Sequence, residues 1–222
     1  MLYVYAITDS VHPPASAGLQ GAAPRVMGKR APFAVVTDHK DLPPQPSEED
    51  LWRHERVVEE LMERSTVLPM RFGSNVADEA KLQTILDERR YEFEALIEGL
   101  RGAVELGVRA QIPTGMTEPA GVAAGTAAGP GSAYLLERAE RQRRAADAIA
   151  RIHEPLAMLA RRSTRSVGGL NPGTFKGSYL VDRGRVEAFR ERVGELASEL
   201  DAARIACTGP WPPYSFSSGE GE

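Results

Sequence analysis

The residues in this chain that could carry acid–base or metal chemistry are few and widely separated. The four histidines are His12, His39, His54 and His153, and the one cysteine is Cys207. His54 and His153 are each followed by Glu, but neither has a second histidine four residues on, as a helical zinc site requires. One cysteine excludes a disulfide framework and a four-thiolate zinc site. We therefore expect no catalytic residue, no cofactor-binding residue and no metal ligand.

His54 has the most distinctive surroundings of these side chains. It lies beside Arg53 and Glu55, near Val57 and Val58, at the edge of the apolar face of an expected helix. Three roles are open: a histidine at the core boundary whose hydrogen bonds are satisfied within the fold, a residue that contacts a partner, and a catalytic base. The sequence around it favours the first.

The glycine-rich segments do not match a nucleotide-binding loop. Gly168–Gly173 followed by Lys176 has the composition of a phosphate-binding loop but the wrong spacing, and it is more typical of a β-hairpin loop. Gly125, Gly129 and Gly131 lack the preceding strand of a dinucleotide fold. The sequence also contains no Gly-x-Ser-x-Gly elbow that would present a nucleophilic serine.

Composition indicates an ordinary folded protein. The chain has 222 residues, 42% hydrophobic and 26% charged, with a formal net charge of -4. An acidic balance argues against nucleic acid as a partner. The apolar runs are far shorter than the ~20 residues that span a bilayer, so no membrane partner is expected. No basic region precedes the first apolar run, and the lone cysteine suits a reducing compartment, so we expect a cytoplasmic protein.

The first hundred residues predict an α+β domain over residues 1–101. Ser47 precedes three acidic residues, which suits a helix N-cap. Pro69 inside an apolar run indicates an edge strand or a bulge. The expected elements are strands at 2–7, 33–37 and 66–72, a helix that starts at Ser47 and includes Met62, and a helix at 78–99.

Residues 102–208 predict a second α+β domain. Its order of elements is strand, helix, strand, strand, helix, strand, which is the ferredoxin-like βαββαβ arrangement of an antiparallel sheet with helices on one face. The expected elements are strands at 104–110, 164–167, 174–181 and 204–208 and helices at 132–160 and 186–200. The fold class is thus two tandem α+β domains.

Two segments differ in composition from these domains. Residues 111–131 consist mainly of Gly, Ala, Pro and Thr, which predicts a flexible loop. Residues 209–222 form a tail in which Trp211, Tyr214 and Phe216 are set among Pro210, Pro212 and Pro213. Such a stiff extended segment either folds back over its own domain or binds a partner.

The expected helix at 132–160 is rich in arginine. Its apolar positions recur every seven residues, which suits an amphipathic helix on a sheet better than a coiled coil. Acidic residues between the arginines favour a solvated, salt-bridged surface; the alternative is a docking surface for an acidic partner.

Four stretches together resemble the gas vesicle protein F/L family. They are LYVYAI at 2–7, LWRHERVVEELMERSTVLPMRFGS at 51–74, YLVDR at 179–183 and TGPWPPYSF at 208–216. The second and fourth are specific, and the four occur in order along almost the whole chain.

The resemblance implies a non-enzymatic accessory or minor structural protein of gas vesicles. Such a protein is expected in the cytoplasm and at the vesicle, in contact with the very hydrophobic major shell protein and with other gas vesicle accessory proteins. The competing hypothesis is a ferredoxin-like module that binds a small molecule or acts as an enzyme. The residues hypothesised to bind partners are Trp52, His54, Arg71, Trp211, Tyr214 and Phe216.

Overall fold

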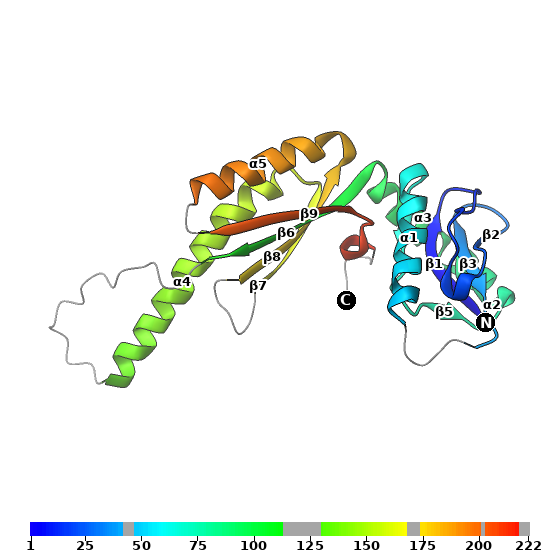
Figure 1. The fold of residues 1–222 in the computed structure, drawn as a ribbon, viewed down its shortest axis with the longest axis horizontal. Helices are drawn as coiled ribbons and strands as arrows, with labels where there is room; N and C mark the ends of the chain where they lie inside the picture. Colours follow the sequence, from blue (N-terminus) through cyan, green and yellow to red (C-terminus); the bar gives the residue numbers. More distant parts are fainter. Residues whose placement is uncertain (42–46, 113–129, 168–173, 201–202, 218–222) are drawn as a thin grey trace. The chain divides into compact units, whose positions relative to one another are not determined.

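The structure is a computed structural model, and it describes residues 1–41, 47–112, 130–167, 174–200 and 203–217. The chain divides into two compact units (Figure 1). Unit 1 comprises Met1–Glu105 together with Pro210–Glu222, and unit 2 comprises Leu106–Gly209. The expected domains 1–101 and 102–208 stay a prediction. The expected flexible loop at 111–131 and the hairpin loop at 168–173 fall largely or wholly outside the described residues.

Unit 1 contains an antiparallel sheet. Its strand order is β2-β3-β1-β4, and β5 also pairs with β1. All seven residues of β1 are buried, which is why this strand lacks polar alternation. The strands are β1 (Leu2–Thr8), β2 (Arg25–Met27), β3 (Phe33–Asp38), β4 (Val67–Pro69) and β5 (Asn75–Val76).

Three α-helices belong to unit 1: α1 (Glu48–Arg64), α2 (Glu79–Glu88) and α3 (Arg90–Leu100), and a 3-10 turn, η1, covers Leu19–Gly21. Helix α1 begins as predicted, because the Ser47 hydroxyl accepts a hydrogen bond from the Asp50 amide at 3.0 Å.

The prediction of a single helix at 78–99 is wrong, because the helix is interrupted at Arg89 and divides into α2 and α3. The interruption lies at two charged residues, Arg89 and Arg90, which separate the apolar positions of the two helices. There the buried Arg90 turns its guanidinium onto the Ala31 carbonyl and the Asp87 carboxylate. These contacts fix the side chain of Arg90 at the start of α3.

The strand predicted at 66–72 is also too long, because β4 ends at Pro69. Proline has no N–H to extend the ladder. Beyond it the chain makes one more bond to β1, from the Met70 amide to the Tyr5 carbonyl at 2.9 Å, and then turns. Gly73 takes a φ of +89° in that turn, a conformation that favours glycine.

Unit 2 is built on a four-stranded sheet with strand order β7-β8-β6-β9. Its elements are β6 (Ala103–Gln111), α4 (Pro130–Ala157), β7 (Arg162–Val167), β8 (Thr174–Asp182), the 3-10 turn η2 (Arg183–Arg185), α5 (Val186–Glu199) and β9 (Arg204–Trp211). Side chains of both helices join one core with alternate residues of the strands, so α4 and α5 cover the same face of the sheet (Figure 1). An α+β class with two antiparallel sheets is therefore confirmed.

The tail is less extended than the sequence predicts. Strand β9 continues to Trp211, and a 3-10 turn, η3, closes at Tyr214–Phe216. Phe216 is 2% exposed, which accounts for the turn, since it brings this ring into a buried site.

Candidate functional site

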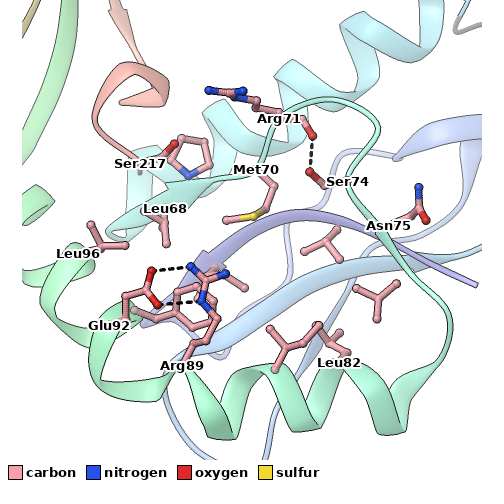
Figure 2. Close-up of a pocket in the computed structure, with 16 residues that line it drawn as sticks. Leu68, Met70, Arg71, Ser74, Asn75, Leu82, Arg89, Glu92, Leu96 and Ser217 are labelled. Carbon is pink, nitrogen blue, oxygen red and sulfur yellow. Dashed lines mark hydrogen bonds and ion pairs between the residues drawn. The ribbon is translucent and has the colours of Figure 1, made fainter. Parts of the chain in front are cut away.

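Unit 1 contains an open apolar groove with a volume of about 770 Å³. We call it the unit 1 groove. Figure 2 shows Leu82 and Leu96 on the side formed by α2 and α3, and Met70 and Ser74 on the loop that follows β4. The residues that line it are Val4, Ile7, Leu68, Pro69, Met70, Arg71, Ser74, Asn75, Val76, Leu82, Ile85, Arg89, Glu92, Phe93, Leu96 and Ser217.

Charge in the unit 1 groove is confined to three of its lining residues. Arg89 donates to Glu92 at 2.8 Å, and its guanidinium lies 4.9 Å from the centroid of the Phe93 ring. Arg71 is exposed, and its carbonyl accepts the Ser74 hydroxyl at 2.7 Å. Arg89 and Glu92 neutralise each other, and the surface of the groove divides almost evenly between polar and apolar atoms. Its apolar part suits a partner segment that has an apolar face.

A buried hydrogen-bond chain holds the loop that borders this groove. The Gly73 amide donates to the Tyr3 hydroxyl at 3.1 Å, and that hydroxyl lies 2.8 Å from Nδ1 of His54. Tyr3 is fully buried in β1 and His54 is 1% exposed in α1. The loop is therefore tied to the sheet and to α1 through side chains.

The same histidine holds the tail. Nε2 of His54 lies 3.1 Å from the Tyr214 hydroxyl, which in turn donates to the Glu55 carboxylate at 3.2 Å. A backbone amide can only donate and a carboxylate can only accept, so donation runs one way from Gly73 to Glu55. That order assigns the proton of a neutral His54 to Nε2 and leaves Nδ1 to accept from Tyr3. We call these five groups the His54 chain.

Burial sets the protonation of the His54 chain. It lowers the pKa of His54 from 6.5 to about 4, so the ring is neutral at pH 7. Burial likewise raises the pKa of Tyr3, and burial together with the nearby Glu55 charge raises the pKa of Tyr214. The pKa of Glu55 is raised too, chiefly by burial. Both hydroxyls therefore stay protonated and available as donors.

The tail has two further anchors in unit 1. The Ser215 amide and hydroxyl donate to the two oxygens of Glu105 at 2.9 and 2.7 Å. Phe216 is buried, and Ser217 then lines the unit 1 groove. The tail thus belongs to unit 1 and not to the domain that it follows in sequence.

The six residues hypothesised to bind partners fall into three groups. His54 and Tyr214 meet in the His54 chain. Phe216, two residues after Tyr214 in the tail, is buried. Arg71 lines the unit 1 groove. Trp52 and Trp211 are 67% and 44% exposed, and neither lines the groove. Partner binding by all six stays a prediction.

Sequence reasoning missed the groove itself. Ile85 of α2 and Leu96 of α3 remain half-buried on the groove instead of closing into the core. It also missed Tyr3, a hydroxyl in an otherwise apolar strand. That hydroxyl is the available signal, because a buried Tyr oxygen needs a hydrogen-bond partner.

Across the described ranges, no three His, Cys, Asp or Glu side chains gather closely enough to hold a metal ion. Within those same ranges no helix is both long and apolar enough to cross a bilayer.

We predict that Tyr214→Phe lowers the free energy of unfolding by roughly 1–3 kcal/mol, because it leaves the His54 N–H and the Glu55 carboxylate without their partner. Urea unfolding measures this. Tyr91→Phe is the matched control, since Tyr91 is 84% exposed on α3. Equal stability of the two variants would contradict the hydrogen-bond chain.

The depressed pKa of His54 also predicts a pH dependence. The unfolded chain binds a proton at His54 below about pH 6.5, whereas the folded chain does so only near pH 4. The free energy of unfolding is therefore unaffected by this group above pH 6.5. It falls by on the order of 3 kcal/mol as the pH decreases towards 4.

Other groups contribute to the same pH profile, so the test compares the pH dependence of a variant with that of the unmodified protein. The pKa values of His39 and His153 are also lowered by burial, and the raised pKa of Glu55 acts in the opposite direction. His54→Gln should flatten the dependence of unfolding free energy on pH between 7 and 5, as roughly one titrating group disappears. The exposed His12→Gln should leave it unchanged. An unaltered slope in His54→Gln would refute the assignment.

Comparison with known proteins gives a consistent family. The sequence model described as "Gas vesicle synthesis protein GvpL/GvpF" matches residues 1–218. Gas vesicle protein L of Streptomyces sp. (strain CB03234) is 31% identical over 252 residues, which cover 97% of this chain and 92% of that protein. Gas vesicle protein F1 of Halobacterium salinarum is 30% identical over 186 residues, 82% of this chain and 76% of that protein.

Solved structures agree in fold. The crystal structure of the gas vesicle protein GvpF from Anabaena sp. PCC7120 superimposes with a TM-score of 0.84 at 20% identity, covering 99% of both chains. GvpF from Microcystis aeruginosa gives 0.79 at 19% identity, covering 98% of both. The family match runs through both units and through the tail up to Ser218, and on that evidence this chain belongs to the gas vesicle synthesis protein GvpL/GvpF family.

Proposed function

We propose that this protein binds the hydrophobic shell subunit of gas vesicles during vesicle formation, in the cytoplasm and at the growing vesicle, and that it also contacts other accessory proteins. The observation that carries the proposal is the unit 1 groove, in which the apolar side chains of Met70, Ile85 and Leu96 remain partly open to solvent. Family membership supplies the gas vesicle context.

The physical argument rests on what an apolar shell subunit needs before assembly. The exposed apolar surface of such a subunit would associate non-specifically in water. A groove lined by Met70, Ile85 and Leu96 can cover part of this surface. Each Å² of apolar area that is removed from water stabilises the complex by about 25 cal/mol. An amphipathic helix or a short apolar strand is the natural occupant, since apolar grooves bind such segments through regularly spaced side chains.

The His54 chain has a positioning role in this proposal. It holds the Met70–Ser74 loop through Gly73 and the tail through Tyr214, and these segments contribute Met70, Arg71 and Ser217 to the groove. His54 itself is enclosed and does not line the groove, so it offers nothing to a substrate placed there.

The exposed indoles supply candidate contacts for accessory proteins. Trp52 and Trp211 are large apolar groups that remain in water, and tryptophan is enriched among the residues that dominate binding energy at protein interfaces. Both lie in stretches that carry the family resemblance.

We also infer that unit 2 is ferredoxin-like. Support comes from its element order β6-α4-β7-β8-α5-β9, its strand order β7-β8-β6-β9 and the common face of α4 and α5. That fold hosts many unrelated functions, so it assigns none here.

The proposal predicts that Leu96→Asp reduces co-purification of the co-expressed shell protein by roughly tenfold or more, because a charge inside the groove must be desolvated against an apolar partner. Tyr91→Asp is the matched control: it introduces the same charge on the same helix, at a position outside the groove. Gas vesicle formation should fail with Leu96→Asp and proceed with Tyr91→Asp.

Unfolding curves of both variants separate loss of binding from loss of fold. Met70→Asp tests the opposite side of the groove and should behave as Leu96→Asp does. Undiminished shell-protein binding by folded Leu96→Asp and Met70→Asp would sink the groove as the contact site.

A further inference from the structure

The sheet of unit 2 has one face under α4 and α5 and one face without a helix. Leu106, Val108 and Ala110 of β6 point into the core beneath the helices, as do Phe175 and Tyr179 of β8. Successive side chains of a strand alternate between faces. Arg109 of β6 and Lys176 of β8 therefore lie on the helix-free face, and both are exposed.

The two outer strands extend this face. The Thr208 hydroxyl donates to the Gly107 carbonyl at 3.4 Å and lies 2.9 Å from the point where a Cβ on Gly107 would stand. Thr208 and, by alternation, Arg204 of β9 therefore share the face with Gly107. Strand β7 pairs Ser166 with Lys176 and Thr164 with Ser178, which places the β7 hydroxyls there too.

We propose that this helix-free face, which we call the basic face, is a docking surface for an acidic protein segment whose Asp and Glu carboxylates are bound by Arg109, Lys176 and Arg204. The proposal concerns unit 2 and is independent of the groove in unit 1.

The positive charges of the basic face lack acidic partners within the described part of the protein. Among the described residues, Arg109, Lys176 and Arg204 form no ion pair with an acidic side chain. The acidic residues at the ends of the strands that carry them already have partners: Glu105 accepts from Ser215, and Asp182 pairs with Arg161. The cations of the basic face are thus available to a carboxylate from outside.

The distribution of charge along the chain strengthens this argument. Residues 106–209 contain 15 Lys and Arg against 11 Asp and Glu, whereas the remaining residues contain 12 against 20. The overall charge of -4 therefore conceals a basic unit. A positive face on a positive unit attracts acidic partners and raises their association rate.

The side chains of the basic face favour an acidic protein segment over nucleic acid. Arginine guanidinium groups bind carboxylates bidentately, and neighbouring Ser and Thr hydroxyls can donate to the remaining oxygens. In the described part of β6, β7, β8 and β9, no aromatic side chain lies on this face for nucleobases to stack on, and the aromatic residues of β8 point into the core.

The test uses the full-length protein and a fluorescein-labelled peptide of about 16 residues in which Glu and Ser alternate, with Gln replacing Glu in the control peptide. Fluorescence anisotropy should show binding of the Glu peptide only, weakening as salt rises. Arg109→Glu/Lys176→Glu should weaken binding by roughly tenfold or more. Arg143→Glu/Arg151→Glu, the same charge change at two exposed positions of α4, should keep it within about twofold.

Three results would overturn the proposal. Equal weakening by both double variants would mean that net charge alone attracts the peptide. Equal binding of the Gln peptide would mean that carboxylates are not recognised. Tighter binding of a single-stranded oligonucleotide, lost in Arg109→Glu/Lys176→Glu, would make the face a nucleic-acid surface. If the double charge reversal does not fold, the neutral Arg109→Gln and Lys176→Gln variants take its place, each expected to weaken binding about threefold.

Discussion

Unit 1 depends on one buried histidine that must stay neutral. His54 accepts from Tyr3 and donates to Tyr214, so a second proton on the ring would displace the Tyr3 donor from Nδ1. Burying these polar groups is tolerable only because each is satisfied. The arrangement joins segments that are far apart in sequence: the first strand, the first helix, the loop after β4 and the C-terminal tail. A polar network of this kind fixes one geometry, whereas apolar contacts alone would tolerate several.

That geometry matters because the unit 1 groove is built from segments with little structure of their own. Strand β4 has three residues, the loop beyond it turns at Gly73, and η3 is a single 3-10 turn. None of these would hold its place by backbone hydrogen bonding within itself. Helices α2 and α3 form the more regular side, and the Arg90 contacts at their junction determine where α3 begins. The groove therefore combines a rigid helical side with a side positioned through His54.

The sequence predicted the elements better than it predicted their limits. Strand β1, the Ser47 cap and the order of elements in unit 2 follow from local periodicity and capping, which a single sequence displays directly. The end of β4 follows from Pro69 itself. The break at Arg89, in contrast, depends on the contact of Arg90 with the distant Ala31, which local patterns do not encode. The same holds for the site. His54 and Tyr214 could be singled out by type, but their meeting across 160 positions, and the groove beside them, arise only in the folded chain.

The apolar groove and the basic face are of opposite chemistry, and each lies within a different unit. An apolar groove gains affinity from area removed from water, an effect that salt does not screen. A basic face gains affinity and association rate from charge, which salt does screen. A protein with both can hold an apolar subunit through unit 1 and an acidic partner through unit 2 without competition between the two ligands for one surface. Because salt screens only the second of these affinities, raising the ionic strength would release the acidic partner while the apolar subunit stays bound.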